Sequence, residues 1–107
     1  MKPNRSLAED WYEAAERFVA LDAAASMLEE GRTAFKSQRV LALGDIPVSR
    51  AEAIVTGSDE WSSYVKKMVR AREQANLAKV EAEFLKMKFS EHMSKDANAR
   101  TEARMVR

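Results

Sequence analysis

Residues 58–89 read SDEWSSYVKKMVRAREQANLAKVEAEFLKMKF, and this stretch decides the fold of the chain. Apolar residues recur along it at steps of three and four, which is the heptad spacing of a helix that packs against another helix. This packing row consists of Trp61, Tyr64, Met68, Ala71, Ala75, Ala78, Ala82, Leu85 and Phe89. Because no Gly or Pro follows Gly57, we expect one uninterrupted helix over 58–104.

A similar apolar row precedes this stretch and predicts a first long helix over 7–43. The row consists of Leu7, Trp11, Ala14, Phe18, Leu21, Ala25 and Leu28. Ser6 and Glu9 have the spacing of a capping box, in which the serine oxygen accepts a hydrogen bond from the Glu9 N–H and the glutamate reaches back to the Ser6 N–H. At Gly31, inside the helix, we expect a bend or a close crossing.

The segment between the two long helices is expected to be ordered. Gly44 acts as a left-handed cap and Pro47 stops the first helix. Ser49 and Glu52 repeat the capping-box spacing and predict a short connecting helix over 49–56, after which Ser58 caps the long helix. We therefore predict an all-α chain, a single domain over 1–107, in which two long antiparallel helices form a helical hairpin or coiled coil.

A second apolar row on the long helix has no partner in such a hairpin. It consists of Val65, Val69, Leu77, Val80, Phe84 and Met87. A two-helix core is only one layer thick, so a second copy or a foreign protein should cover this row, and we predict a homodimer. The residues after Phe89 outrun the first helix and are expected to project as an arm.

The composition disfavours catalytic and metal sites. The chain has no Cys, three isolated Gly and a single His, His92, so disulfides, thiolate zinc sites, phosphate loops and Ser-His-Asp sets are not expected. His92 and Asp96 lie one helical turn apart, but two ligands do not make a metal site. We expect neither an enzyme nor a cofactor. No membrane-spanning segment or signal peptide is recognisable, and a cytoplasmic location is expected.

The charge distribution leaves a nucleic-acid contact open. The net charge is +1, but the first 57 residues hold 7 bases and 9 acids, a net of −2, and the remainder holds 11 bases and 8 acids, a net of +3. Bases gather near the start and at the end of the long helix: Lys66, Lys67, Arg70, Arg72, Arg100, Arg104 and Arg107. Interleaved acids favour an ordinary solvated face, with contact to a phosphate backbone as the alternative.

Large side chains outside the packing rows indicate a protein partner. Trp11 and Trp61 lie on the rows and are expected in the core, whereas Tyr12 lies off its row. Tyrosine and methionine are well suited to interfaces because they offer a large or adaptable contact area. The candidate partner contacts are Tyr12, Phe84, Met87, Phe89 and Met93.

Three blocks of sequence resemble a family of short helical accessory proteins of tailed bacteriophages and prophages. They are LGDIPVSRAE over 43–52, EFLKMKFSE over 83–91 and ANARTE over 97–102. The family is encoded among early genes near recombination and replication functions. It has no assigned activity, so the resemblance assigns no residue a role. It implies a virus-encoded protein that acts in a bacterial cell by binding a host or phage protein complex.

Three functions follow as hypotheses. The favoured one is a non-enzymatic interaction protein that binds and modulates or inhibits a host nucleic-acid-processing or defence protein complex. The first alternative is a DNA-binding accessory protein of phage recombination or replication. The second is a structural coiled-coil spacer, which requires only the heptads.

Overall fold

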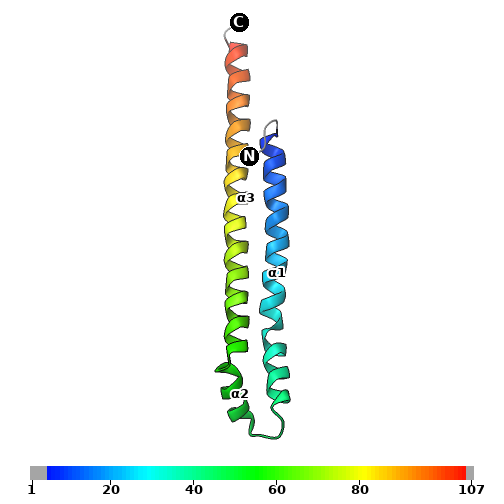
Figure 1. The fold of residues 1–107 in the computed structure, drawn as a ribbon. Helices are drawn as coiled ribbons and strands as arrows, with labels where there is room; N and C mark the ends of the chain where they lie inside the picture. The colour runs from blue at the N-terminus through cyan, green and yellow to red at the C-terminus, as the bar shows by residue number, and fades with distance from the viewer. Residues whose placement is uncertain (1–4, 106–107) are drawn as a thin grey trace. The chain divides into compact units, whose positions relative to one another are not determined.

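The structure, a computed structural model, describes residues 5–105 and contains three helices in that range (Figure 1). Helix α1 spans Leu7–Ala42, α2 spans Val48–Thr56 and α3 spans Asp59–Met105. The described residues include no strand, which confirms the all-α prediction. Each helix boundary lies within one residue of the predicted one.

The chain divides into two compact units, and α1 and α3 each contribute to both. The terminal unit is the described part of Met1–Val19 and Asn76–Arg107, and the central unit is Ala20–Ala75. The central unit also contains α2.

In the central unit, α1 and α3 are antiparallel and approach closely. Ala25 and Ala75 are both 0% exposed, as expected where small side chains let two helices come together. An aromatic cluster lies C-terminal to Ala25 on α1 and N-terminal to Ala75 on α3. The ring centroids of Phe35 and Tyr64 are 4.6 Å apart, and those of Phe35 and Trp61 are 6.3 Å apart. The packing row of α3 predicted from the sequence is therefore the row that meets α1 in this unit.

The terminal unit has the same antiparallel arrangement around a different core. Ala14, Ala82 and Leu85 are buried together, with Trp11 packed against them. The ring of Trp11 lies 5.6 Å from that of Phe89, centroid to centroid. After Phe89, every described residue of α3 is exposed, so residues 90–105 make no buried contact within this unit.

Gly31 marks a close crossing without a break in the helix. α1 is continuous through this position. A Cβ atom built on Gly31 would lie 3.0 Å from the hydroxyl oxygen of Tyr64, closer than an ordinary van der Waals contact. The close crossing expected at Gly31 is therefore present.

The N-terminal caps of the long helices agree with the sequence. Glu9 donates its backbone N–H to the Ser6 hydroxyl oxygen at 3.1 Å, and Trp61 donates to that of Ser58 at 3.2 Å. The return bond of the first box differs, because the Ser6 hydroxyl itself donates to the Glu9 carboxylate at 3.2 Å. Gly44 has φ of 82°, the left-handed conformation expected of a glycine cap.

The predicted capping box of the connecting helix is wrong. α2 begins at Val48, with Pro47 as its N-cap residue and no capping hydrogen bond from a side chain. The Pro47 carbonyl oxygen accepts the first helical bond, from the Ala51 N–H at 3.0 Å. Since the helix starts one residue earlier than predicted, Ser49 lies inside its first turn, where it cannot serve as the cap.

Candidate interaction surface

Four large apolar side chains form an exposed row on α3 in the terminal unit. This outer row consists of Leu77, Val80, Phe84 and Met87, which are 63%, 62%, 55% and 70% exposed. Each follows a member of the packing row by two residues, which corresponds to about 200° around a helix, so the outer row lies opposite the face that meets α1. Its steps of three, four and three residues are themselves heptad spacing.

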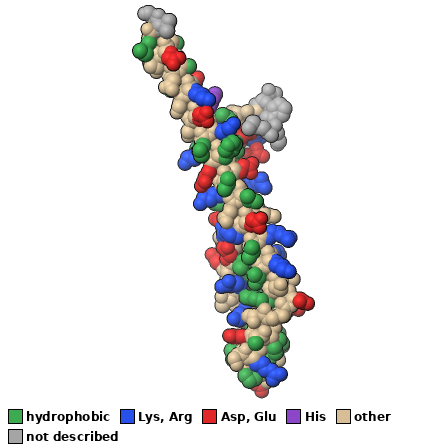
Figure 2. Space-filling view, turned by 90° about the vertical axis from the view of Figure 1, so that its left-hand side faces the viewer, with side chains coloured by type: hydrophobic (Ala, Val, Ile, Leu, Met, Phe, Trp, Pro, Cys, Tyr) green, Lys and Arg blue, Asp and Glu red, His purple; other side chains and the backbone are tan. Residues whose placement is uncertain are grey.

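Charged residues flank and bound the outer row. Glu83 and Lys88 lie on opposite flanks, and neither forms an ion pair within residues 5–105. The ammonium of Lys88 lies 5.5 Å from the centre of the Phe84 ring. Glu73 and Glu91 occupy the next positions of the row at its two ends. Hydrophobic, basic and acidic side chains are mixed over the face of the molecule that Figure 2 shows.

The other predicted partner contacts do not share one environment. Tyr12 is 71% exposed and Met93 is 49% exposed, so both present apolar surface to solvent. Phe89 is half-buried and packs on Trp11. It therefore belongs to the contact between α1 and α3 rather than to an exposed surface. By its spacing in the sequence, Phe89 lies on the packing row, whereas Phe84 and Met87 lie on the outer row. This difference in spacing is the signal that would have identified Phe89 as a residue of the helix-helix contact.

The predicted basic cluster also divides. Lys66, Lys67 and Arg70 are exposed on α3 and form no ion pair with any residue that the structure describes. Arg100 pairs with Asp96 one turn earlier at 2.5 Å. Arg104 is exposed, and Arg107 lies outside the described residues.

Arg72, the fourth member of the cluster near the start of α3, binds acids of α1 instead of facing solvent. Its Nη1 donates to Asp22 at 2.6 Å, and its Nη2 and Nε donate to the two oxygens of Glu29 at 2.7 and 3.0 Å. A fourth bond runs from Nη2 to the Ser26 hydroxyl at 3.3 Å. These hydrogen bonds lower the pKa of Glu29 and raise the pKa of Arg72. A guanidinium engaged in this way has few donors left for a phosphate.

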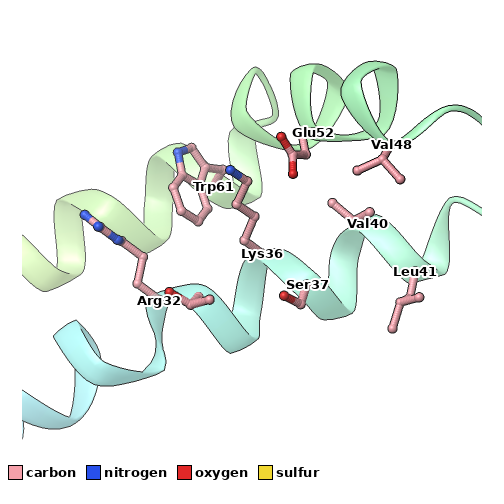
Figure 3. Close-up of a pocket in the computed structure, with 9 residues that line it drawn as sticks. Arg32, Lys36, Ser37, Val40, Leu41, Val48, Glu52 and Trp61 are labelled. Atoms are coloured by element: carbon pink, nitrogen blue, oxygen red, sulfur yellow. The ribbon is translucent and has the colours of Figure 1, made fainter.

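A pocket of about 540 Å³ lies between the three helices of the central unit (Figure 3). The Lys36 side chain reaches from α1 toward the Trp61 indole, and Glu52 points toward α1 from α2 (Figure 3). The lining therefore combines cations, a carboxylate, an indole and aliphatic groups: Arg32, Thr33, Lys36, Ser37, Val40, Leu41, Val48, Glu52 and Trp61. The sequence did not indicate this pocket, because it depends on where α2 packs.

Neither a metal centre nor a membrane span is found in the described part of the chain. Among residues 5–105, no three His, Asp or Glu side chains are grouped so that they could hold an ion. His92 is exposed on α3. None of the three helices combines the length and the apolar character needed to cross a bilayer.

No protein-family model, curated protein or solved structure matches this chain.

Proposed function

We propose that this chain is a non-enzymatic interaction protein whose outer row packs against a helix of another polypeptide. The observation that carries the proposal is the exposure of Leu77, Val80, Phe84 and Met87 at heptad spacing. Burial of apolar surface stabilises an association by about 25 cal/mol per Å². Residues at steps of three and four match the grooves of a facing helix, so a helical segment fits this row better than a small molecule does.

The proposed biological role is the modulation or inhibition of a host nucleic-acid-processing or defence protein complex in the bacterial cytoplasm. The resemblance to short helical phage proteins supports this context. In this proposal the hairpin works as a homodimer. We assign the target contact to Tyr12 and Met93, because both side chains are exposed and lie outside the outer row. Tyrosine is frequent among the residues that dominate binding energy, and methionine adapts to irregular binding surfaces.

Affinity purification from infected bacterial cells tests the proposed target. The wild-type chain should retain one defined protein complex, and the double variant Tyr12→Ala/Met93→Ala should bind the purified complex about tenfold more weakly, a loss of about 1.4 kcal/mol. Met27→Ala is the matched control, because Met27 is equally exposed on α1 but lies in the central unit. Equal binding by the double variant and the wild type would contradict the assignment of these two contacts.

DNA binding is the second candidate function, and it is favoured by Lys66, Lys67 and Arg70, which are exposed and free of ion pairs in the described range. If these residues contact phosphates, affinity for DNA should fall steeply with salt, with a logarithmic slope of about −0.9 per contact on duplex DNA. Replacing all three by Glu should abolish binding. A salt-independent interaction, or none, would remove this candidate, and would leave both the interaction protein and the coiled-coil spacer.

A further inference from the structure

We propose that the outer row is covered by the outer row of a second copy of this chain, with the two α3 helices parallel and in register. This inference names the partner of the helix-docking surface, and it rests on the proposed function. The row is an independent seam on the side of α3 opposite the packing row, so a second α3 can pack there without displacing α1 from its contact in the terminal unit.

A second copy fits the row because the row is complementary to itself. A two-fold interface places the same surface on both subunits, so each copy must supply both the apolar side chains and the spaces that receive them. Heptad spacing meets this requirement for helices, as each apolar residue packs between residues of the facing helix. In a parallel, in-register pair, Leu77, Val80, Phe84 and Met87 each meet their counterparts in successive layers.

The charges beside the row favour the parallel orientation. In parallel helices, a residue on one flank of the seam faces the residue five positions later on the other flank of the partner. Glu83 of one copy then faces Lys88 of the other, and the reverse pair forms as well. Both residues are free of ion pairs in the structure as described.

The antiparallel orientation brings like charges together. An antiparallel pair that aligns the same four apolar residues has its two-fold axis near residue 82, and residues on the same flank then face each other. Glu81 would meet Glu81, and Glu83 would meet Glu83. The acids at the two ends of the row do not separate the orientations, because Glu73 and Glu91 face their own counterparts in the parallel pair and face each other in the antiparallel pair. The Glu81 and Glu83 contacts, which the parallel pair lacks, oppose the antiparallel arrangement.

The length of the row sets the expected affinity. Glu73 and Glu91 bound an apolar stretch of about two heptads, so the interface is small compared with a stable dimer, which buries about 1,600 Å² in total. We therefore expect a reversible dimer with a dissociation constant in the micromolar range, which corresponds to a standard free energy of association on the order of −8 kcal/mol. The dimer should dissociate on dilution, which makes it measurable by sedimentation equilibrium.

Sedimentation of the purified full chain is the first test. The wild type should be mainly dimeric at about 100 µM and monomeric at much lower concentration. Val80→Glu should remain monomeric throughout, whereas Met27→Glu, which adds the same charge at an exposed position of α1, should sediment like the wild type. Unchanged helical circular dichroism of both variants shows that they fold. A wild-type chain that is monomeric at 100 µM would overturn the proposal.

Cysteine cross-linking is the second test, and it reads the orientation. The chain has no Cys, so Val80→Cys carries a single thiol. In the parallel dimer this thiol faces its counterpart, so mild oxidation should give a disulfide-linked dimer, while Lys79→Cys, a quarter turn away, should not. Efficient linking of Val80→Cys to Phe84→Cys, with no self-linking of either variant, would instead show the antiparallel dimer and contradict the proposed register.

Charge exchange is the third test. Glu83→Lys should weaken the dimer severalfold, and the double variant Glu83→Lys/Lys88→Glu should restore it, because the exchanged charges still face each other in the parallel pair. Failure of the double variant to recover contradicts the parallel pairing.

A monomeric wild type that nevertheless binds a target helix through Val80 refutes only the self-association. If Val80→Glu affects neither association nor target binding, the proposed helix-docking function itself is refuted.

Discussion

The hydroxyl of Tyr64 donates a hydrogen bond of 2.5 Å to the backbone carbonyl oxygen of Leu28. This bond links α3 to α1 at the turn of α1 that contains Gly31. The same hydroxyl occupies the space that a Gly31 side chain would need. The glycine, which would ordinarily weaken a helix, therefore allows a polar contact between the two long helices of the central unit.

Tyr64→Phe should destabilise the fold by about 1 kcal/mol, the usual net value of one hydrogen bond in a protein. The ring would keep its stacking on Phe35, so the loss reports the hydroxyl alone. Urea unfolding followed by circular dichroism measures the difference. Tyr12→Phe is the control, since the Tyr12 side chain is exposed and forms no hydrogen bond with a described residue; equal losses in both variants would contradict the prediction.

Gly31→Ala should fail to give the stabilisation of about 1 kcal/mol that this substitution normally gives inside a helix. The new methyl group would lie 3.0 Å from the Tyr64 hydroxyl oxygen and would push it from the Leu28 carbonyl. In the Tyr64→Phe background the obstruction is gone, so the same substitution should stabilise. The coupling between the two sites is measured by a double-mutant cycle of unfolding free energies, and simple additivity would refute the contact.

The ion pair of Glu29 with Arg72 should make stability depend on pH in the acid range. Hydrogen bonding to Arg72 lowers the pKa of Glu29 below its ordinary value of 4.5. The unfolded chain therefore takes up the proton first as pH falls, so the contribution of the pair is complete above 4.5 and is lost as pH drops through the lowered, folded-state pKa. Unfolding curves of the wild type and Glu29→Gln should differ at neutral pH and converge in acid; a constant difference would contradict the prediction.

Two phenylalanines five residues apart should respond differently to truncation. Phe89→Ala should destabilise the fold by about 2 kcal/mol, because it removes the ring that packs on Trp11. Phe84→Ala should change the stability of the isolated hairpin by less than about 0.5 kcal/mol, since the Phe84 ring is exposed. Denaturation at concentrations below dimer formation measures both values. The opposite order would contradict the packing of Phe89 on Trp11 and the exposure of Phe84.

The contacts of Arg72 depend on information that a single sequence does not contain. In the chain, Arg72 follows Lys66, Lys67 and Arg70 and reads as part of one basic run. Its partners Asp22 and Glu29 lie more than 40 positions earlier, and only the register between α1 and α3 brings them into hydrogen-bond distance. A shift of the two helices by one turn would leave every heptad position apolar or polar as before, yet it would give Arg72 other neighbours.

The amino-acid sequence by itself determined the three helices, their caps at Ser6, Ser58 and Gly44, and the faces of α1 and α3 that are apolar, because these depend on residues within one or two helical turns of each other. Tertiary structure decided which of the residues that the sequence predicts to be exposed are exposed in the folded chain. The pairing of Trp11 with Phe89, the binding of Arg72 by acids of α1 and the pocket beside Trp61 each join segments that are far apart in the chain. Such contacts depend on the register and separation of packed helices, which periodicity alone leaves undefined.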